Sequence, residues 1–196
     1  MVYVPVSSAL PGWTAYIDSV QQTQVQQNAY DTGLAVIDIF GPNYPAAEPS
    51  PGIVPGVIDG NYSVLLQAGA EPGTSGVTTG VSIAQTGTVP DDDQWMQFRA
   101  WETYWTGFTV SFDGNSLSPV VLGTGANYTL YGVNIAPYSG QTGQLEFTAD
   151  FVTPGSSWLG LDDIAFAATP EPSPLVLTGI GGVLFALYRR FALKRQ

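Results

Sequence analysis

The chain has 196 residues, of which 44% are hydrophobic and 11% charged, so it can form a folded core and is not a charge-rich disordered chain. Residues 1–188 contain sixteen acids and one base, Arg99, a net charge of −15 that excludes the phosphate backbone of nucleic acids as a partner. Cysteine and histidine are absent, and the one lysine is Lys194. Disulfides, thiolate chemistry, the usual zinc ligands and histidine-activated nucleophiles are therefore excluded.

Hydrophobic residues alternate with polar ones along most of the chain, and this period of two predicts β-strands. The clearest run is Gln144–Phe151, in which every second residue is apolar. The other predicted strands are Ala35–Phe40, Tyr62–Ala68, Val81–Val89, Trp95–Thr103, Phe108–Phe112, Tyr128–Ile135 and Leu159–Ala167.

Turn signals separate these runs, as expected for a chain with 23 glycines and 15 prolines. They are Asp59-Gly60-Asn61, Asp113-Gly114-Asn115 and Gly123-Thr124-Gly125, and residues 42–56 are typical of a long surface loop. About ten short strands without a convincing soluble helix predict an all-β sandwich of two sheets over residues 1–168.

One predicted strand, Trp95–Thr103, offers a candidate ligand platform. Its even-numbered residues 96–100 are apolar and form the expected core face. The opposite face carries Trp95, Arg99 and Trp101, and two indoles flanking a guanidinium suit stacking on a sugar ring. The alternative is that a neighbouring strand or loop covers these rings.

The segments Asn134–Thr142, Leu145–Phe147 and Trp158–Phe166 resemble the closing strands of galactose-binding-like jelly rolls, the fold of many carbohydrate-binding modules. The resemblance implies a jelly-roll-like sandwich in which Asp163 helps to hold a structural calcium ion, whose oxygen ligands suit an acidic chain without histidine. The alternative is that Asp162 or Asp163 caps backbone N–H groups of a turn. On a regular strand, the side chains of these two neighbours point to opposite faces, so they cannot form an acid–base pair. Each face of this strand also carries large apolar residues.

The chemistry of the body indicates that the protein is not an enzyme. A serine nucleophile would find neither histidine nor lysine as its base. A pair of carboxylates could hydrolyse glycosides, but no spacing singles out such a pair. Asp91-Asp92-Asp93 is typical of a solvated turn.

Residues 175–188 carry no charge, follow Pro174 and end at Arg189 and Arg190. As a helix they span about 21 Å, and snorkelling arginines extend this toward the roughly 30 Å hydrocarbon core. The alternative is a hydrophobic helix packed on the body. Because the segment is apolar all round and stops at a basic cluster, we predict a transmembrane helix with residues 189–196 as a cytoplasmic stub and the acidic body outside.

Residues 169–174 form a proline-rich linker directly before this apolar run. The order of Pro-Glu-Pro, short apolar helix and basic cluster resembles the PEP-CTERM sorting tail of Gram-negative bacteria. The resemblance covers residues 170–195. In it, Pro170, Glu171 and Pro172 match the signature, and Arg189 and Arg190 match the basic stop. It implies processing by an exosortase-type membrane enzyme, followed by delivery from the inner membrane to the cell surface or the extracellular polysaccharide.

Proteins of this kind begin with a secretory signal peptide, whereas residues 1–10 have no basic region and a short apolar stretch broken by Pro5. We therefore expect the true start of the gene to lie upstream. The sequence as a whole predicts an exported surface or extracellular-matrix protein whose body is structural or adhesive. The two alternatives are a carbohydrate-binding module facing extracellular polysaccharide and a glycosidase that uses carboxylates.

Overall fold

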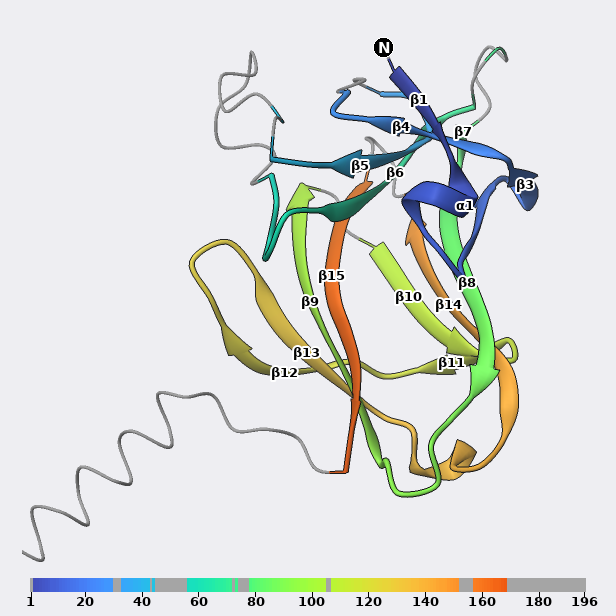
Figure 1. The fold of residues 1–196 in the computed structure, drawn as a ribbon, viewed down its shortest axis with the longest axis vertical. Helices are drawn as coiled ribbons and strands as arrows, with labels where there is room; N and C mark the ends of the chain where they lie inside the picture. The colour runs from blue at the N-terminus through green and yellow to red at the C-terminus, as the bar shows by residue number, and fades with distance from the viewer. Residues whose placement is uncertain are drawn as a thin grey trace, which may run out of the picture.

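A computed structural model describes residues 2–29, 33–42, 44, 56–71, 73, 78–104, 107–151 and 157–168. They form two packed β-sheets, so the predicted all-β, two-sheet sandwich is confirmed (Figure 1). In the described part of the chain, no helix has the length and apolar character that crossing a bilayer requires. The linker 169–174, the apolar run 175–188 and the stub 189–196 lie outside the described residues.

The larger sheet has nine strands, and β7 (Thr78–Thr79) pairs with β6 at its side. Across the sheet the order is β1 (Val2–Pro5), β4 (Gln24–Gln27), β5 (Val36–Phe40), β6 (Ser63–Ala70), β15 (Ser157–Ala167), β9 (Trp95–Tyr104), β13 (Thr129–Asn134) and β12 (Val120–Thr124). The smaller sheet has the order β11 (Asn115–Leu117), β10 (Gly107–Phe112), β14 (Thr142–Asp150), β8 (Val81–Thr88), β2 (Thr14–Ile17) and β3 (Val20–Gln22).

Every predicted strand coincides with an observed one, and no end differs by more than two residues. The predicted turn at Asp113-Gly114 is also confirmed, because both residues have positive φ (48° and 74°) and Phe112 pairs with Asn115 across it. The predicted turn at 123–125 is misplaced: Gly123 and Thr124 end β12, and the chain turns over 125–128.

Several short elements were not predicted from the sequence, and most of them lie in the N-terminal segment. They are the strands β1, β2, β3, β4, β7, β11 and β12 and two short helical turns. A single helical turn, α1 (Val6–Ala9), joins β1 to the loop before β2, and a 3-10 turn, η1 (Ala136–Tyr138), follows β13. Strand β4 pairs antiparallel with β1 and parallel with β5, and thereby connects the N-terminal strand to the larger sheet.

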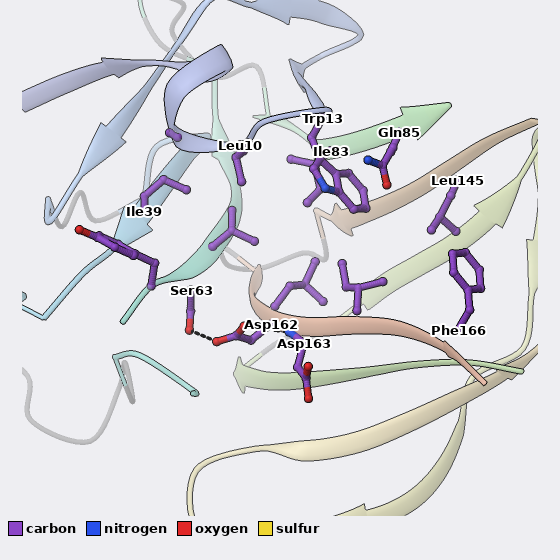
Figure 2. A pocket seen from close by; sticks show the side chains of 15 residues that line it. Leu10, Trp13, Ile39, Ser63, Ile83, Gln85, Leu145, Asp162, Asp163 and Phe166 are labelled. Atoms are coloured by element: carbon purple, nitrogen blue, oxygen red, sulfur yellow. Dashed lines mark hydrogen bonds between the residues drawn. The ribbon is translucent and has the colours of Figure 1, made fainter. Parts of the chain in front are cut away.

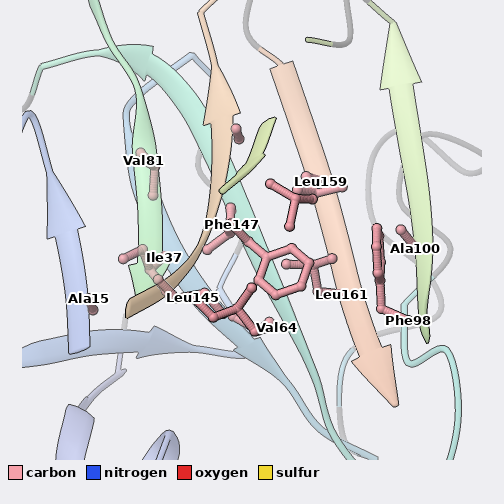
Figure 3. Packing of buried hydrophobic residues seen from close by; sticks show 14 of the residues in the cluster. Ala15, Ile37, Val64, Val81, Phe98, Ala100, Leu145, Phe147, Leu159 and Leu161 are labelled. Carbon is pink, nitrogen blue, oxygen red and sulfur yellow. The ribbon is translucent and has the colours of Figure 1, made fainter. Parts of the chain in front are cut away.

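Alternate residues of both sheets fill the space between them (Figure 3). Phe98 from β9 meets Phe147 from β14 edge to face, with ring centroids 5.1 Å apart, and both side chains are fully buried. Met96 and Ala100 are also fully buried, which confirms the predicted core face of residues 96–100.

A second, smaller apolar cluster lies on the other face of the larger sheet. It contains strand residues that alternate with those pointing into the main core. Phe40, Leu65, Trp101 and Trp158 come from four strands of this sheet, and Ile58 from the segment before β6 packs with them. Because this segment carries Asp59 and Tyr62 as well, the cluster fixes the position of the loop that borders the candidate site.

Candidate functional site

A cavity of about 340 Å³ opens between the two sheets next to the residues that follow α1 (Figure 2). Its floor is the apolar inner surface of the sandwich, and its rim carries aromatic and polar side chains. The floor includes Leu10, Ile39, Val64, Ile83, Leu145 and Leu161. The rim includes Trp13, Tyr62, Ser63, Gln85, Asp162 and Phe166.

A second cavity of about 350 Å³ adjoins the first, because both are lined by Ala9, Ile39 and Tyr62. Val4 from β1 and Gln27 from β4 form its other side. Tyr62 is exposed and stands between the two cavities. The two cavities together form an elongated groove, which we call the Tyr62 groove, under the N-terminal segment of the chain. A groove with an apolar floor and a polar rim is the usual shape of a small-molecule or sugar site.

Asp162 on β15 accepts hydrogen bonds from three other residues at the rim of the groove. Its Oδ2 accepts hydrogen bonds from the Ser63 hydroxyl (2.7 Å) and from the Asp59 backbone N–H (3.1 Å), and its Oδ1 accepts one from the Asp163 N–H (2.8 Å). Ser63 Oγ in turn accepts from the Ile58 N–H (2.8 Å). Both carboxylate oxygens therefore hold the backbone, as the capping alternative for this aspartate predicts, and the Ser63 hydroxyl is engaged in the same network.

The strand is not regular at this point. Asp163 has φ +50°, and the register of β15 against β9 shifts between Asp162 and Ala165. This β-bulge inserts one residue and turns the Asp163 side chain toward the Arg99 guanidinium, Nη2 to Oδ2 3.2 Å. The prediction that the two aspartates point to opposite faces is therefore wrong, since both contact groups around Asp59 and Arg99.

Arg99 links three groups at the outer face beside the groove. It pairs with Asp59 and with Asp163, and its guanidinium carbon lies 4.9 Å from the centre of the Tyr128 ring. The Gly60 N–H and the Arg99 guanidinium hold the pKa of Asp59 below its usual value. The positive charge beside Asp163 is thus supplied by Arg99.

The predicted platform is divided between different environments. Trp101 is buried in the smaller apolar cluster, where its indole lies across Gly160 of β15, as the alternative of a covered ring predicts. Trp95 is half-buried at the start of β9, and Arg99 is engaged in ion pairs. The three side chains do not form an open row for a sugar ring.

No group of three or more histidine, cysteine or acidic residues placed to hold a metal ion occurs in the part of the chain that the structure describes. Calcium binding by Asp163 therefore stays a prediction from the resemblance to jelly rolls. The triplet Asp91-Asp92-Asp93 lies at the turn before β9, as predicted.

The sequence gives little indication of the groove. Trp13, Tyr62 and Gln85 come from three distant segments, and only the pairing of the sheets brings them to one rim. The only local signal is the position of Tyr62 directly after the predicted turn at Asp59-Gly60-Asn61, and the sequence does not show that its side chain is exposed.

No protein-family model matches this chain, and comparison with curated proteins finds no match. Among solved structures, the chain is similar to the enzymatically active domain of tailspike protein 4 of bacteriophage CBA120. The TM-score is 0.43 and the sequence identity 14%, over 83% of this chain and 20% of the phage protein. The chain thus spans about a fifth of the length of that protein.

Proposed function

We propose that this protein is an exported surface or extracellular-matrix protein of a Gram-negative bacterium, with a structural or adhesive, non-catalytic β-sandwich. The observation that carries the proposal is the division of charge along the chain. Residues 1–188 have a net charge of −15, and four of the five basic residues follow the apolar run 175–188. Such an arrangement suits a body outside the membrane and a basic stub inside.

The proposed route starts as a single-pass protein of the inner membrane. An exosortase-type enzyme would recognise Pro170, Glu171 and Pro172 in the linker, and Arg189 and Arg190 would stop the chain at the cytoplasmic surface. Release near the linker would free the acidic body for the cell surface or the extracellular polysaccharide.

Fractionation of the native host with mass spectrometry of the C-terminus tests this route. We expect chains trimmed near residue 171 outside the inner membrane, and untrimmed chains held in the membrane for Glu171→Ala. Glu48→Ala is the matched control, because Glu48-Pro49-Ser50 repeats the tripeptide Glu171-Pro172-Ser173 within the body. Untrimmed wild-type chains free in the cytosol would contradict the proposal.

A carbohydrate-binding module with a jelly-roll-like sandwich is the second candidate, and the Tyr62 groove favours it. Aromatic rings of Trp13, Tyr62 and Phe166 at the rim suit the C–H faces of a sugar, and the Gln85 amide can bond to hydroxyl groups. The carboxylates of Asp162 and Asp163 at the same rim would repel uronic acids. We therefore expect neutral sugars to bind here.

A glycan array followed by titration calorimetry tests this candidate. Tyr62→Ala should weaken binding of a neutral oligosaccharide about tenfold, equivalent to about 1.4 kcal/mol. Tyr3→Ala is the control, because Tyr3 is similarly exposed (53% against 56%) and does not line the groove. Loss of binding in Trp95→Ala with full binding in Tyr62→Ala would place the ligand on β9 instead and refute a site in the groove.

A further inference from the structure

The floor of the Tyr62 groove consists of aliphatic side chains. Six residues form it, and the five that lie on strands are buried, with exposed fractions of 1–7%. Leu10, Ile39 and Ile83 approach this space from three separate segments of the chain (Figure 2). Because little water reaches such a surface, it favours a ligand with a long apolar part.

A sugar ring would not be stable on this floor. Each hydroxyl group placed there would lose its water and find no side chain with which to form a hydrogen bond. The backbone of a peptide would suffer the same loss. An alkyl chain has no polar group, and it gains free energy with every methylene group that it buries. The floor therefore favours an alkyl chain.

The groove is also elongated, which suits a chain better than a compact apolar group. Its two cavities, of about 340 and 350 Å³, share Ala9 and Ile39. Beyond these residues, Val4 on β1 continues the apolar lining. Residues 1–17 contain no charged residue, so the N-terminal wall of the groove is uncharged.

The charges at the rim limit the head group that such a chain can carry. Among the described residues that line the groove, Asp162 and Asp163 are the charged ones, and none is basic. An anionic head group would be repelled by these carboxylates and would find no cation among the lining residues. The ligand therefore has an uncharged head group.

We propose that the Tyr62 groove binds a neutral glycolipid, with the alkyl chain on the floor and the sugar head group at the rim. There the Gln85 amide can bond to hydroxyl groups, and the rings of Trp13 and Tyr62 can pack against C–H faces. The inference rests on the second candidate function, because it names the ligand of the same groove. It does not depend on the sorting tail.

Photolabelling of the full-length chain tests this inference. The probe is an alkyl glucoside with a diazirine at the end of its chain, and the protein is kept in CHAPS, a steroid detergent without an alkyl chain. Peptide mass spectrometry after irradiation locates the inserted label. We expect label in peptides that line the groove, and competition by dodecyl maltoside but not by maltose at the same concentration. The apolar run 175–188 should take up the probe in every sample and serves as the internal reference.

Ala9→Phe is the blocking variant, because Ala9 is half-buried and lines both cavities. A phenyl ring there should reduce labelling of the groove about tenfold, a factor that the loss of two buried methylene groups already supplies. Ser7→Phe is the matched control, because Ser7 is exposed on the same helical turn and lines neither cavity. It should be labelled like the wild-type chain. Competition by dodecyl maltoside needs no variant, so the test stands even if Ala9→Phe folds poorly.

A second probe tests the charge of the head group. An alkyl sulfate with the same chain and diazirine should label the groove about fivefold less than the glucoside, because Asp162 and Asp163 repel its charge.

Three results would overturn the inference. They are label confined to residues 175–188, groove labelling that Ala9→Phe leaves unchanged, and equal labelling by the sulfate and the glucoside. The failure of the second candidate function looks different. If an oligosaccharide binds on the glycan array and Tyr62→Ala weakens it while the floor stays unlabelled, the sugar site remains and the glycolipid alone is refuted. If no neutral oligosaccharide binds and a long-chain alcohol probe labels the groove as well as the glucoside, the second candidate function is refuted together with the sugar head group.

Discussion

Asp38 on β5 should make the protein less stable as the pH rises toward neutrality. Its side chain is fully buried, and although Oδ2 accepts a hydrogen bond from the Ala29 N–H (3.0 Å), Oδ1 has no hydrogen-bond partner among the described residues. Burial raises the pKa of this carboxyl from 3.8 to about 7, and the amides of Ala29, Ile39 and Asn28 offset only part of the rise.

The sign and size of the effect follow from this pKa. Because the folded state holds the Asp38 proton more tightly than the unfolded state, stability is highest at acid pH and falls as the pH rises from about 4 to about 7. The slope is about 1.36 kcal/mol per pH unit and flattens near pH 7, where the folded carboxyl is half ionised, so the change between pH 5 and pH 7 is about 2 kcal/mol. Above pH 7 the contribution of Asp38 levels off.

Asp38→Asn removes this titration and keeps the shape of the side chain. The wild-type chain should lose about 3 kcal/mol of unfolding free energy between pH 5 and pH 8 through Asp38, and the variant should not. The difference between variant and wild type should therefore grow by this amount, because any cost of the new amide is the same at every pH. Urea unfolding followed by tryptophan fluorescence at several pH values measures this difference. A difference that stays constant with pH would refute the reasoning.

Asp59→Asn is the control for this measurement. The pKa of Asp59 is lowered by the Gly60 N–H and Arg99, so this exposed carboxylate is ionised in both the folded and the unfolded state from pH 5 to pH 8. Its contribution to stability is lost only below this window. The effect of Asp59→Asn on the free energy of unfolding should therefore be the same at pH 5 and at pH 8.

Three further predictions concern the bulge, the covered tryptophan and calcium. Asp162→Ala should lower the free energy of unfolding by about 1–3 kcal/mol, because it leaves backbone and hydroxyl donors unpaired, whereas Asp163→Ala should cost less than about 1 kcal/mol, because its ion pair is exposed. Equal costs in urea unfolding would contradict the role given to Asp162. Gly160→Ala should cost about 1–3 kcal/mol, because its Cβ would overlap the Trp101 indole, while Gly87→Ala, with open space at the Cβ position, should be nearly neutral. The calcium site predicted at Asp163 should give a higher melting midpoint with calcium than with a chelator, and identical midpoints would contradict that site.

The fold was predictable where strands alternate clearly and turns carry their own signals. Gln144–Phe151 alternates without interruption, and the observed β14 has its inward residues fully or nearly buried. The N-terminal strands β3 and β4 are short and rich in glutamine, so they show no such pattern. Their place in the sheets depends on pairing with distant strands, such as β4 with β5, which local sequence does not specify.

The Tyr62 groove depends on the same long-range pairing. Tyr62, Gln85 and Phe166 are separated by long stretches of chain, and they reach one rim only because β6, β8 and β15 belong to two sheets that face each other there. The residues of the predicted platform lie in different environments for a related reason. Alternation places Trp95 and Trp101 on one face of β9, but it does not reveal that the segment before β6 packs over Trp101.

The bulge at Asp163 did leave a signal in the sequence, namely a change in the phase of the apolar residues. Leu159 and Leu161 are two apart, but the next large apolar residue is Ile164, three positions on. On a regular strand, Ile164 and Phe166 would point away from the core. With one residue inserted, they stay on the same side as Leu161, and all three line the groove. Asp163 occupies the inserted position in the left-handed conformation that aspartate tolerates better than most residues. A shift of phase at a pair of aspartates should therefore be interpreted as a bulge that keeps one face apolar, rather than as a strand with two apolar faces.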